Sequence, residues 1–303
     1  MSQQYFIADV FTDEAFSGAQ IAVFPEAGEI DDTRMQLIAR ELNLTETVFV
    51  TESDSTDVDY QMRIFTPLAE VDFAGHPIIA TAYALVECGA IKTDQSAVKL
   101  MMSQNSGVIE VNITLQDGEV NLVQFSQKVS TLIDRFTPSD SELAEFLTLA
   151  ENDLDHQKYS TRLVSAGFPY LIVPVWNYES VRKAKFNFSA WSQSTAPQTA
   201  AQEIVLFSPK TPYQDSNFNV RLLGQNIGPN DDPPVGSAMP AFASYLCSFD
   251  FTQEGTHTFA VDRGDSYSRR SVINMEMDNK QRSELAIRIG GQAVLVASGN
   301  ILL

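Results

Sequence analysis

Residues 62–76 read MRIFTPLAEVDFAGH, and residues 220–237 read VRLLGQNIGPNDDPPVGS. In each stretch a β-prone segment carries an arginine and leads through a loop to a glycine that opens an apolar helix. The two glycines, Gly75 and Gly236, lie about half the chain apart. This spacing is typical of a duplicated supersecondary unit, so we expect two similar halves.

Short strands dominate the pattern around these two stretches. Residues 107–116 and 119–125 alternate apolar and polar side chains, and Asp117-Gly118 between them is typical of a tight hairpin turn. A second hairpin is expected at Gly290-Gly291. Short strands with one main apolar helix per half favour antiparallel sheets wrapped around a helix over a doubly wound parallel sheet.

Helix signals mark the remaining organisation. Asp31 or Asp32 can cap a helix that ends near Asn43. Ser139 and Glu142 form a capping-box signature that opens a helix through Leu149, so a new unit is expected to start between Ser126 and Pro138. The low-complexity residues 192–202, SQSTAPQTAAQ, are expected to form an exposed surface loop. We predict a first domain over 1–128, completed by a last strand at 285–303, and a second domain over 129–284.

Composition excludes several classes of protein. Among 303 residues, Lys and Arg number 20 and Asp and Glu number 39, which gives a net charge of −19. Nucleic-acid binding requires a basic surface, so a nucleic acid is not an expected partner. The 44% of apolar residues exclude wholesale disorder. The N-terminus lacks a secretory signal and no stretch is long enough to span a membrane, so we expect a cytoplasmic location.

Few residues are suited to holding a metal. The two cysteines, Cys88 and Cys247, form neither a disulfide framework nor a spaced ligand set, and both are interpreted as small core residues. Only three histidines are present. The expected mechanism therefore uses no metal.

The two glycine turns are the first candidates for a functional site. A glycine before a helix lets the backbone approach a ligand, and the first N–H groups of the helix attract an anion. If the halves face each other, Gly75-His76 and Gly236-Ser237 would line opposite walls of a cleft for a small carboxylate. Alternatively, both glycines are ordinary residues at helix starts. His76, at the positive helix end, is a candidate neutral donor or proton carrier.

Carboxylates close to these turns are the candidate acids and bases. Glu46 lies where a helix ends and a strand begins, and partial burial there would suit it to take and return a proton at a substrate carbon. Asp232 opens a stiff turn that leads to Ser237, and Asp72 has a similar place before Gly75. Turn chemistry alone also explains both aspartates, and a cap explains Ser237. Arg63 and Arg221 are interpreted as ion-pair partners at the edge of the core.

These motifs resemble the PhzF family of phenazine-biosynthesis-like isomerases, which share the diaminopimelate epimerase fold. The resemblance rests on stretches that follow the family order across most of the chain: VFTDEAFSG at 10–18, NLTETVFV at 43–50, RIFTPLAEVDFAGHP at 63–77, SAGFPYLIVPV at 165–175 and DDPPVGSA at 231–238. It implies an α+β fold of two similar domains, each a β-barrel-like sheet around a central helix, with an active site in the cleft between them. It also implies a homodimer and no cofactor.

The resemblance also implies roles for individual residues. Glu46 takes the role of the proton-transferring acid/base, and His76, Asp232 and Ser237 support substrate placement and proton traffic. Gly75 and Gly236 would offer N–H groups to a substrate carboxylate or a developing oxyanion, and Gly18 and Asp72 would contact the substrate.

The chain departs from the family pattern at several positions. Gly18-Ala19-Gln20 replaces the usual Gly-Asn-Pro, Val235 replaces a usual threonine, and Arg269-Arg270-Ser271 replaces an arginine-proline-serine element. The first two changes affect the substrate more than the reaction type. The leading hypothesis is a cofactor-independent isomerase that shifts a proton between carbons of a small cyclic or unsaturated carboxylate.

Two rival functions remain open. The first is a two-base amino-acid epimerase or racemase, whose chemistry uses paired cysteine thiols at the helix starts. His76 and Ser237 stand at those positions here. The second is a non-catalytic metabolite-binding or interaction protein that has lost turnover, for which the altered segment at 18–20 is the supporting feature.

Overall fold

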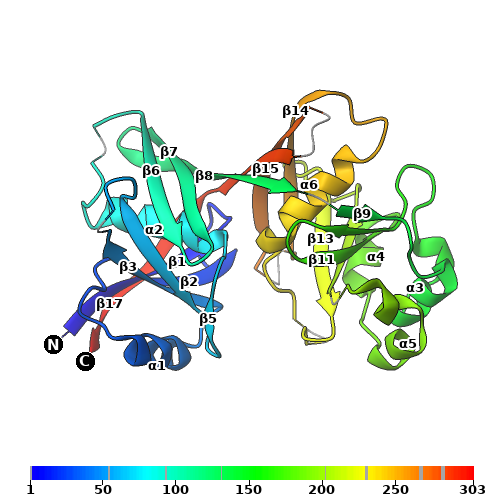
Figure 1. The fold of residues 1–303 in the computed structure, drawn as a ribbon, viewed down its shortest axis with the longest axis horizontal. Helices are drawn as coiled ribbons and strands as arrows, with labels where there is room; N and C mark the ends of the chain where they lie inside the picture. The colour runs from blue at the N-terminus through cyan, green and yellow to red at the C-terminus, as the bar shows by residue number, and fades with distance from the viewer. Residues whose placement is uncertain are drawn as a thin grey trace. The chain divides into compact units, whose positions relative to one another are not determined.

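The computed structural model divides the chain into two compact units (Figure 1). The first unit contains Met1–Gln127, Arg269–Ile273 and Arg288–Leu303, and the second contains Lys128–Ser268 and Asn274–Ile287. The structure describes residues 2–53, 55–92, 94–130, 132–201, 203–228, 231–265, 269–280 and 284–303.

The first unit is a mixed sheet with two helices. Along the sheet, antiparallel pairs join β17 to β1 and β1 to β2, and a parallel pair joins β2 to β3. Next come antiparallel β3–β4, parallel β4–β6 and antiparallel β6–β7 and β7–β8. The elements are β1 (Ser2–Val10), β2 (Ala19–Phe24), α1 (Asp32–Leu42), β3 (Glu46–Glu52), β4 (Tyr60–Phe65), β5 (Glu70–Val71), α2 (His76–Glu87), β6 (Ala97–Gln104), β7 (Gly107–Gln116), β8 (Glu119–Ser130) and β17 (Ala293–Leu302).

The second unit repeats this succession of strand pairs. Antiparallel pairs join β9 to β10 and β10 to β11, followed by parallel β11–β12, antiparallel β12–β13 and parallel β13–β14. Its elements are β9 (Leu132–Asp134), α3 (Asp140–Leu147), η1 (Glu151–Asp153), β10 (Arg162–Ser165), β11 (Pro169–Pro174), α4 (Tyr178–Lys183), α5 (Phe188–Gln193), η2 (Ala196–Thr199), β12 (Glu203–Ser208), β13 (Phe218–Gly224), η3 (Gly236–Ala238), α6 (Met239–Cys247) and β14 (Gly255–Arg263).

Three strands contain residues of both units: β8, β15 (Ser271–Asn279) and β16 (Glu284–Gly291). The repeated order of antiparallel and parallel pairs confirms the duplication predicted from the sequence. Parallel pairs occur where a helix lies between consecutive paired strands, because parallel neighbours require a crossover connection.

The central helix of each half is apolar on nearly all sides, which explains its position. In α2 nine of the twelve residues are buried, and in α6 eight of the nine are buried. A helix without a polar face is stable only when it is covered all round. Accordingly, α2 packs against β1, β2, β3 and β17, and α6 packs against β10 and β11. The prediction of sheets wrapped around a helix is confirmed. The sheets are mixed rather than antiparallel, because the pairs β2–β3, β4–β6, β11–β12 and β13–β14 are parallel.

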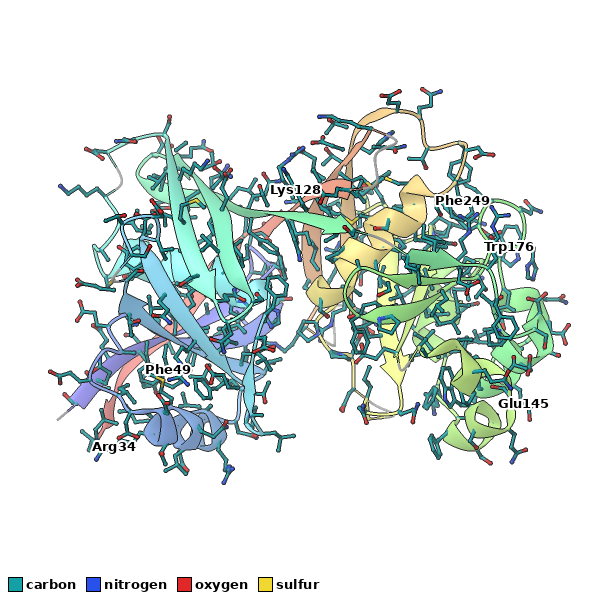
Figure 2. All side chains as sticks on the ribbon, in the orientation of Figure 1. Arg34, Phe49, Lys128, Glu145, Trp176 and Phe249 are labelled. Carbon is teal, nitrogen blue, oxygen red and sulfur yellow. The ribbon has the colours of Figure 1, made fainter. Side chains whose placement is uncertain are left out.

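Local signals in the sequence explain α1 and its core. The side chain of Asp31 caps the helix by accepting a hydrogen bond from Arg34 N at 3.0 Å, and Asn43 ends it with a left-handed φ of 50°. In the core that this helix covers, Phe24 and Phe49 stack with ring centroids 4.9 Å apart. Figure 2 shows Phe49 among the side chains between β3 and α1.

Three expectations are corrected by the structure. Residues 192–201 are not an exposed loop, because they enter α5 and η2, and Ala196, Thr199 and Ala201 are buried; residue 202 lies outside the described residues. Small side chains suit this segment because it packs in the core that contains Trp191. Gly290 and Gly291 are residues of β16 rather than a hairpin turn. Cys88 is exposed rather than a core residue, because it follows the last turn of α2.

Candidate functional site

Glu46 is the first residue of β3, directly after the connection from α1. Its strand pairs in parallel with β2, where Ile21 is the register partner of Glu46. The next residue, Thr47, is fully buried, so β3 enters the core immediately. As a result the Glu46 side chain is only 12% exposed. The position provides the partial burial that was expected for a candidate acid/base.

His76 is the first residue of α2, and its side chain is 8% exposed. Its Nε2 lies 2.5 Å from Oε2 of Glu46. This separation is within hydrogen-bonding distance. The structure therefore brings the two candidate residues of the first unit together as a pair that can hold a proton between them.

Gly75 makes this arrangement possible by lacking a side chain. It caps α2 with φ −82°, which any residue can adopt, so its backbone angle does not require glycine. A Cβ added here would lie 2.6 Å from Cζ of Phe125. Phe125 is itself fixed by an edge-to-face contact with Phe73. Close packing of the turn on the Phe125 ring therefore explains the glycine.

Two other candidates of the first unit have backbone hydrogen bonds to other residues. Asp72 is exposed, and its backbone carbonyl accepts a hydrogen bond from Ser106 N at 3.0 Å. Gly18 has a φ of 65°, donates its N–H to the carbonyl of Arg270 at 2.9 Å and accepts a hydrogen bond from Arg269 Nε at 3.0 Å. Among the described contacts, none joins either residue to Glu46 or His76.

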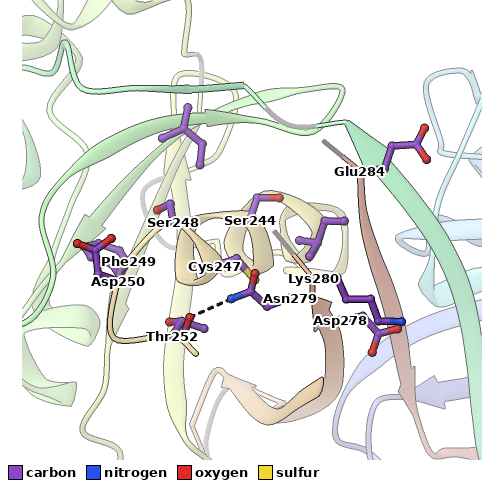
Figure 3. Close-up of a pocket in the computed structure, with 12 residues that line it drawn as sticks. Ser244, Cys247, Ser248, Phe249, Asp250, Thr252, Asp278, Asn279, Lys280 and Glu284 are labelled. Atoms are coloured by element: carbon purple, nitrogen blue, oxygen red, sulfur yellow. Dashed lines mark hydrogen bonds between the residues drawn. The ribbon is translucent and has the colours of Figure 1, made fainter. Parts of the chain in front are cut away.

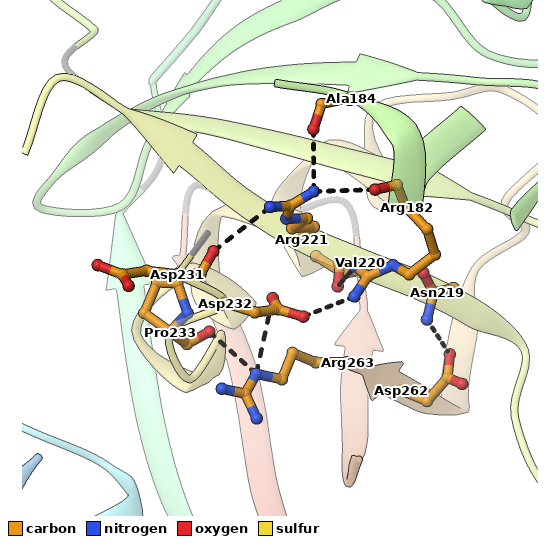
Figure 4. A network of polar contacts seen from close by, with 10 residues as sticks. All are labelled: Arg182, Ala184, Asn219, Val220, Arg221, Asp231, Asp232, Pro233, Asp262 and Arg263. Carbon is orange, nitrogen blue, oxygen red and sulfur yellow. Dashed lines mark hydrogen bonds and ion pairs between the residues drawn. The ribbon is translucent and has the colours of Figure 1, made fainter. Parts of the chain in front are cut away.

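In the second unit Asp232 lies in a network of arginines (Figure 4). Its Oδ2 lies 2.5 Å from Nη1 of Arg182, and its Oδ1 lies 3.7 Å from Nε of Arg263. The Asp232 side chain is 13% exposed. No signal in the sequence points to Arg182, which lies on α4 some fifty residues before its partner. In its described contacts Asp232 behaves as the centre of an ion-pair network.

The two arginines of the repeated strands differ in their partners. Arg63 forms a two-point ion pair with Glu70, with both nitrogen–oxygen distances at 2.8 Å, and also contacts Asp32. Arg221 instead donates to the backbone carbonyls of residues 182, 184 and 231. Burial lowers the pKa of Arg221, although the nearby Asp232 opposes this effect. The ion-pair interpretation therefore applies to Arg63, whereas Arg221 ties loop backbones to β13.

Ser237 is an exposed residue in η3, next to the buried Gly236. Its hydroxyl accepts a hydrogen bond from the Tyr170 hydroxyl at 3.4 Å. Burial raises the pKa of Tyr170 to about 12, so this phenol stays protonated and acts as a donor near neutral pH. Among the described contacts, none joins Ser237 to Asp232.

A cavity of about 660 Å³ lies within the second unit (Figure 3). Its lining includes Cys247, Thr252 and Asn279, at the end of α6 opposite to Ser237. None of the candidate residues lines this cavity. In the described part of the chain, no group of three or more His, Cys, Asp or Glu side chains is arranged to hold a metal.

Comparison with known proteins places the chain among isomerases. Residues 8–299 match the family model PhzC-PhzF, described as phenazine biosynthesis-like protein. An uncharacterized isomerase of Mesorhizobium japonicum is 30% identical over 309 residues, covering 100% of this chain and 99% of its own. A trans-2,3-dihydro-3-hydroxyanthranilate isomerase of Pseudomonas aeruginosa is 38% identical over 128 residues, covering 42% of this chain and 44% of its own.

Solved structures show the same fold. A PhzF-family protein of Bacillus anthracis has a TM-score of 0.85 at 24% identity, with 100% of both chains covered. A hydroxyproline epimerase of Agrobacterium vitis has a TM-score of 0.63 at 13% identity, covering 99% of this chain and 92% of its own. In the described residues, no helix has the length and apolarity needed to cross a membrane.

Proposed function

Because the chain belongs to the PhzC-PhzF family of phenazine biosynthesis-like proteins, we propose that it is a cofactor-independent isomerase that moves a proton between carbons of a small cyclic or unsaturated carboxylate. The observation that carries the proposal is the 2.5 Å contact between Glu46 Oε2 and His76 Nε2. It supplies a largely buried proton carrier at the start of a helix.

Glu46 is the proposed acid/base. Its Oε2 is engaged with His76, so the proposal assigns Oε1 to the substrate proton. The carboxylate takes a proton from one carbon, and the electron pair of the broken C–H bond moves into the conjugated system of the substrate. The protonated Glu46 exchanges this proton with solvent and then delivers a proton to a second carbon, which restores the starting enzyme. A positioned side chain of this kind contributes about 10²–10⁴-fold to a rate.

His76 and the two glycine turns have supporting roles in this proposal. His76 keeps the Glu46 carboxyl in one orientation through the short hydrogen bond. The N–H groups at the start of α2 and of η3 suit a substrate carboxylate or a developing oxyanion. We assign Ser237 to substrate placement, and Asp232 to holding the backbone of its turn through the arginines.

The relatives suggest a first substrate to test. Two of them, from Pseudomonas aeruginosa and Pseudomonas chlororaphis, are named trans-2,3-dihydro-3-hydroxyanthranilate isomerases. That compound is a ring carboxylate with conjugated carbon–carbon bonds, which is the class that the proposed chemistry requires. The matched regions cover 42% and 54% of this chain. The proposal therefore commits to the class, and this compound is its first representative.

The test is incubation of the purified protein with a panel of ring carboxylates in heavy water. The proposal predicts an isomerised product of at least one compound, with deuterium at the carbon that receives the proton. Binding of a compound without either isomerisation or deuterium uptake would favour the non-catalytic alternative and contradict the proposal.

The epimerase alternative finds less support. It needs one cysteine thiol at each helix start, whereas Cys88 follows the last turn of α2 and Cys247 is the last residue of α6. Both thiols therefore stand at the wrong ends of their helices for a two-base mechanism.

A further inference from the structure

The side-chain amide of Gln104 hydrogen-bonds to the backbone of Ala74, immediately before the Gly75-His76 turn. Its Oε1 accepts a hydrogen bond from Ala74 N at 3.1 Å, and its Nε2 donates to the Ala74 carbonyl at 3.1 Å. Gln104 is 6% exposed and Ala74 is 8% exposed. One amide side chain thus satisfies both polar groups of a buried backbone residue, a two-point contact that fixes position as well as orientation.

A second hydrogen bond joins the end of β6 to the loop before His76. Gln104 is the last residue of β6, which pairs in parallel with β4. Two residues later in the turn to β7, Ser106 N donates to the Asp72 carbonyl at 3.0 Å. The end of β6 therefore holds the loop at two successive points before His76.

In the second unit, the last residue of the corresponding strand also hydrogen-bonds to the loop before the glycine. Arg263 is the last residue of β14, which pairs in parallel with β13 as β6 does with β4. Arg263 is 8% exposed, and its Nε donates to the Pro233 carbonyl at 3.3 Å, three residues before Gly236. β6 and β14 are corresponding strands of the repeat. The last residue of each forms a side-chain hydrogen bond to the loop that leads to Gly75 or Gly236.

We propose that Gln104 is a positioning residue for the Glu46–His76 pair. The inference rests on the proposed acid/base function of that pair. His76 is two residues from Ala74, so a displacement of the Ala74 backbone moves the imidazole relative to Glu46. The hydrogen bond between these two side chains is short and both are largely buried. Gln104 acts on the site through the backbone and does not touch the reacting atoms.

Two variants separate the two halves of the contact. Gln104→Met fills similar space but leaves both the N–H and the carbonyl of Ala74 without a partner. In Gln104→Glu an ionised carboxylate still accepts from Ala74 N–H but cannot donate to the carbonyl. Gln116→Met is the matched control, because Gln116 is the exposed last residue of the neighbouring β7.

The readout is NMR of the histidine rings together with hydrogen exchange of backbone amides. The chain has three histidines, so His156 and His257 are internal references for His76. In Gln104→Met we expect the ring signals of His76 alone to shift and the Ala74 amide to exchange at least tenfold faster. In Gln104→Glu we expect the His76 shift with the Ala74 amide still protected.

Activity gives an independent readout. On a substrate that the wild type isomerises, Gln104→Met is expected to lower kcat about tenfold and leave KM within twofold, because orientation of the pair changes while the binding groups remain. The proposal is overturned if a folded Gln104→Met matches Gln116→Met in both His76 signals and Ala74 exchange. If Gln104→Met does not fold, an unshifted His76 in Gln104→Glu overturns it. The NMR readouts need no turnover. They therefore test the positioning role of Gln104 even if the protein proves not to be an isomerase.

Discussion

Glu46 and His76 are each the first residue of their element, β3 and α2, and their side chains meet at 2.5 Å across thirty residues of sequence. The contact forms because α2 packs on β3 and its neighbours. A strand start places the carboxylate at the edge of the core, and a helix start places the imidazole beside N–H groups that attract anions. Changes that move either element start are therefore expected to affect activity strongly.

Gly75→Ala is expected to lower both stability and activity. The added methyl group would lie 2.6 Å from Cζ of the buried Phe125, and overpacking of this kind costs about 2 kcal/mol. Urea unfolding measures the cost, with Gly28→Ala as the control because nothing lies within 4 Å of a Cβ at Gly28. In a Phe125→Leu background the same substitution should cost less. An equal cost in both backgrounds would show that the Phe125 ring is not the reason for the glycine.

Asp232→Asn is expected to reduce stability as well as activity. It would remove the negative charge that Arg182 contacts at 2.5 Å in a largely buried place, and breaking such a pair costs about 3 kcal/mol. Ser237→Ala is the comparison, because the exposed Ser237 should lose activity with stability changed by no more than about 0.5 kcal/mol. Thermal unfolding measures the stability of both variants, and isomerase assays measure their activity. Wild-type stability in Asp232→Asn would instead indicate a purely catalytic aspartate.

Glu70 is expected to stabilise the fold at neutral pH and to lose this effect at acidic pH. The hydrogen bonds from Arg63 lower the pKa of Glu70, opposed by partial burial. A lowered carboxyl pKa in the folded state stabilises the fold above the unfolded pKa, and this stability is lost as pH falls through the folded value. Glu70→Gln should therefore cost about 1 kcal/mol at pH 7, and the difference should shrink below pH 4.

Urea unfolding at pH 7 and at pH 3 measures the Glu70 effect. Glu119→Gln, at an exposed position at the start of β8, is the control. A constant difference between Glu70→Gln and the wild type at both pH values would mean that the ion pair does not contribute.

Removal of both cysteines is expected to leave the reaction intact. Burial raises the pKa of Cys247 to about 11, so only about 0.1% of this thiol is ionised at pH 8. The exposed Cys88 should therefore be alkylated much faster than Cys247. The double variant Cys88→Ser and Cys247→Ser should keep isomerase activity within twofold of the wild type. A loss of a hundredfold or more would revive the two-thiol epimerase mechanism.

Local signals allowed much of the fold to be predicted from the sequence. Asp31 and Asn43 cap α1, Ser139 and Glu142 form the capping box of α3, and Asp117-Gly118 makes the hairpin turn with φ of 54° and 86°. In each case the residues that decide the structure are neighbours in the sequence. The duplication was visible because it repeats such local patterns.

Contacts between distant residues explain what the sequence did not reveal. The segment at 192–201 contains small polar residues, and its burial depends on packing in the core that contains Trp191. In the sequence nothing distinguishes Gln104 from other strand residues, because its hydrogen bonds to the Ala74 backbone join distant positions. The sequence marks Glu46 and His76 as separate candidates, but only the packing of α2 on β3 shows that they touch. The predicted roles of Gly18 and Asp72, the homodimer and the cytoplasmic location stay predictions.

The central claim is that Glu46 carries the proton, and deuterium incorporation by Glu46→Gln tests it most directly. Glu52→Gln is the matched control, because Glu52 is the exposed last residue of the same strand. With a substrate that the wild type isomerises in heavy water, Glu46→Gln should incorporate deuterium at least about 10²-fold more slowly, whereas Glu52→Gln should match the wild type. Undiminished deuterium incorporation in a folded Glu46→Gln protein would contradict the account.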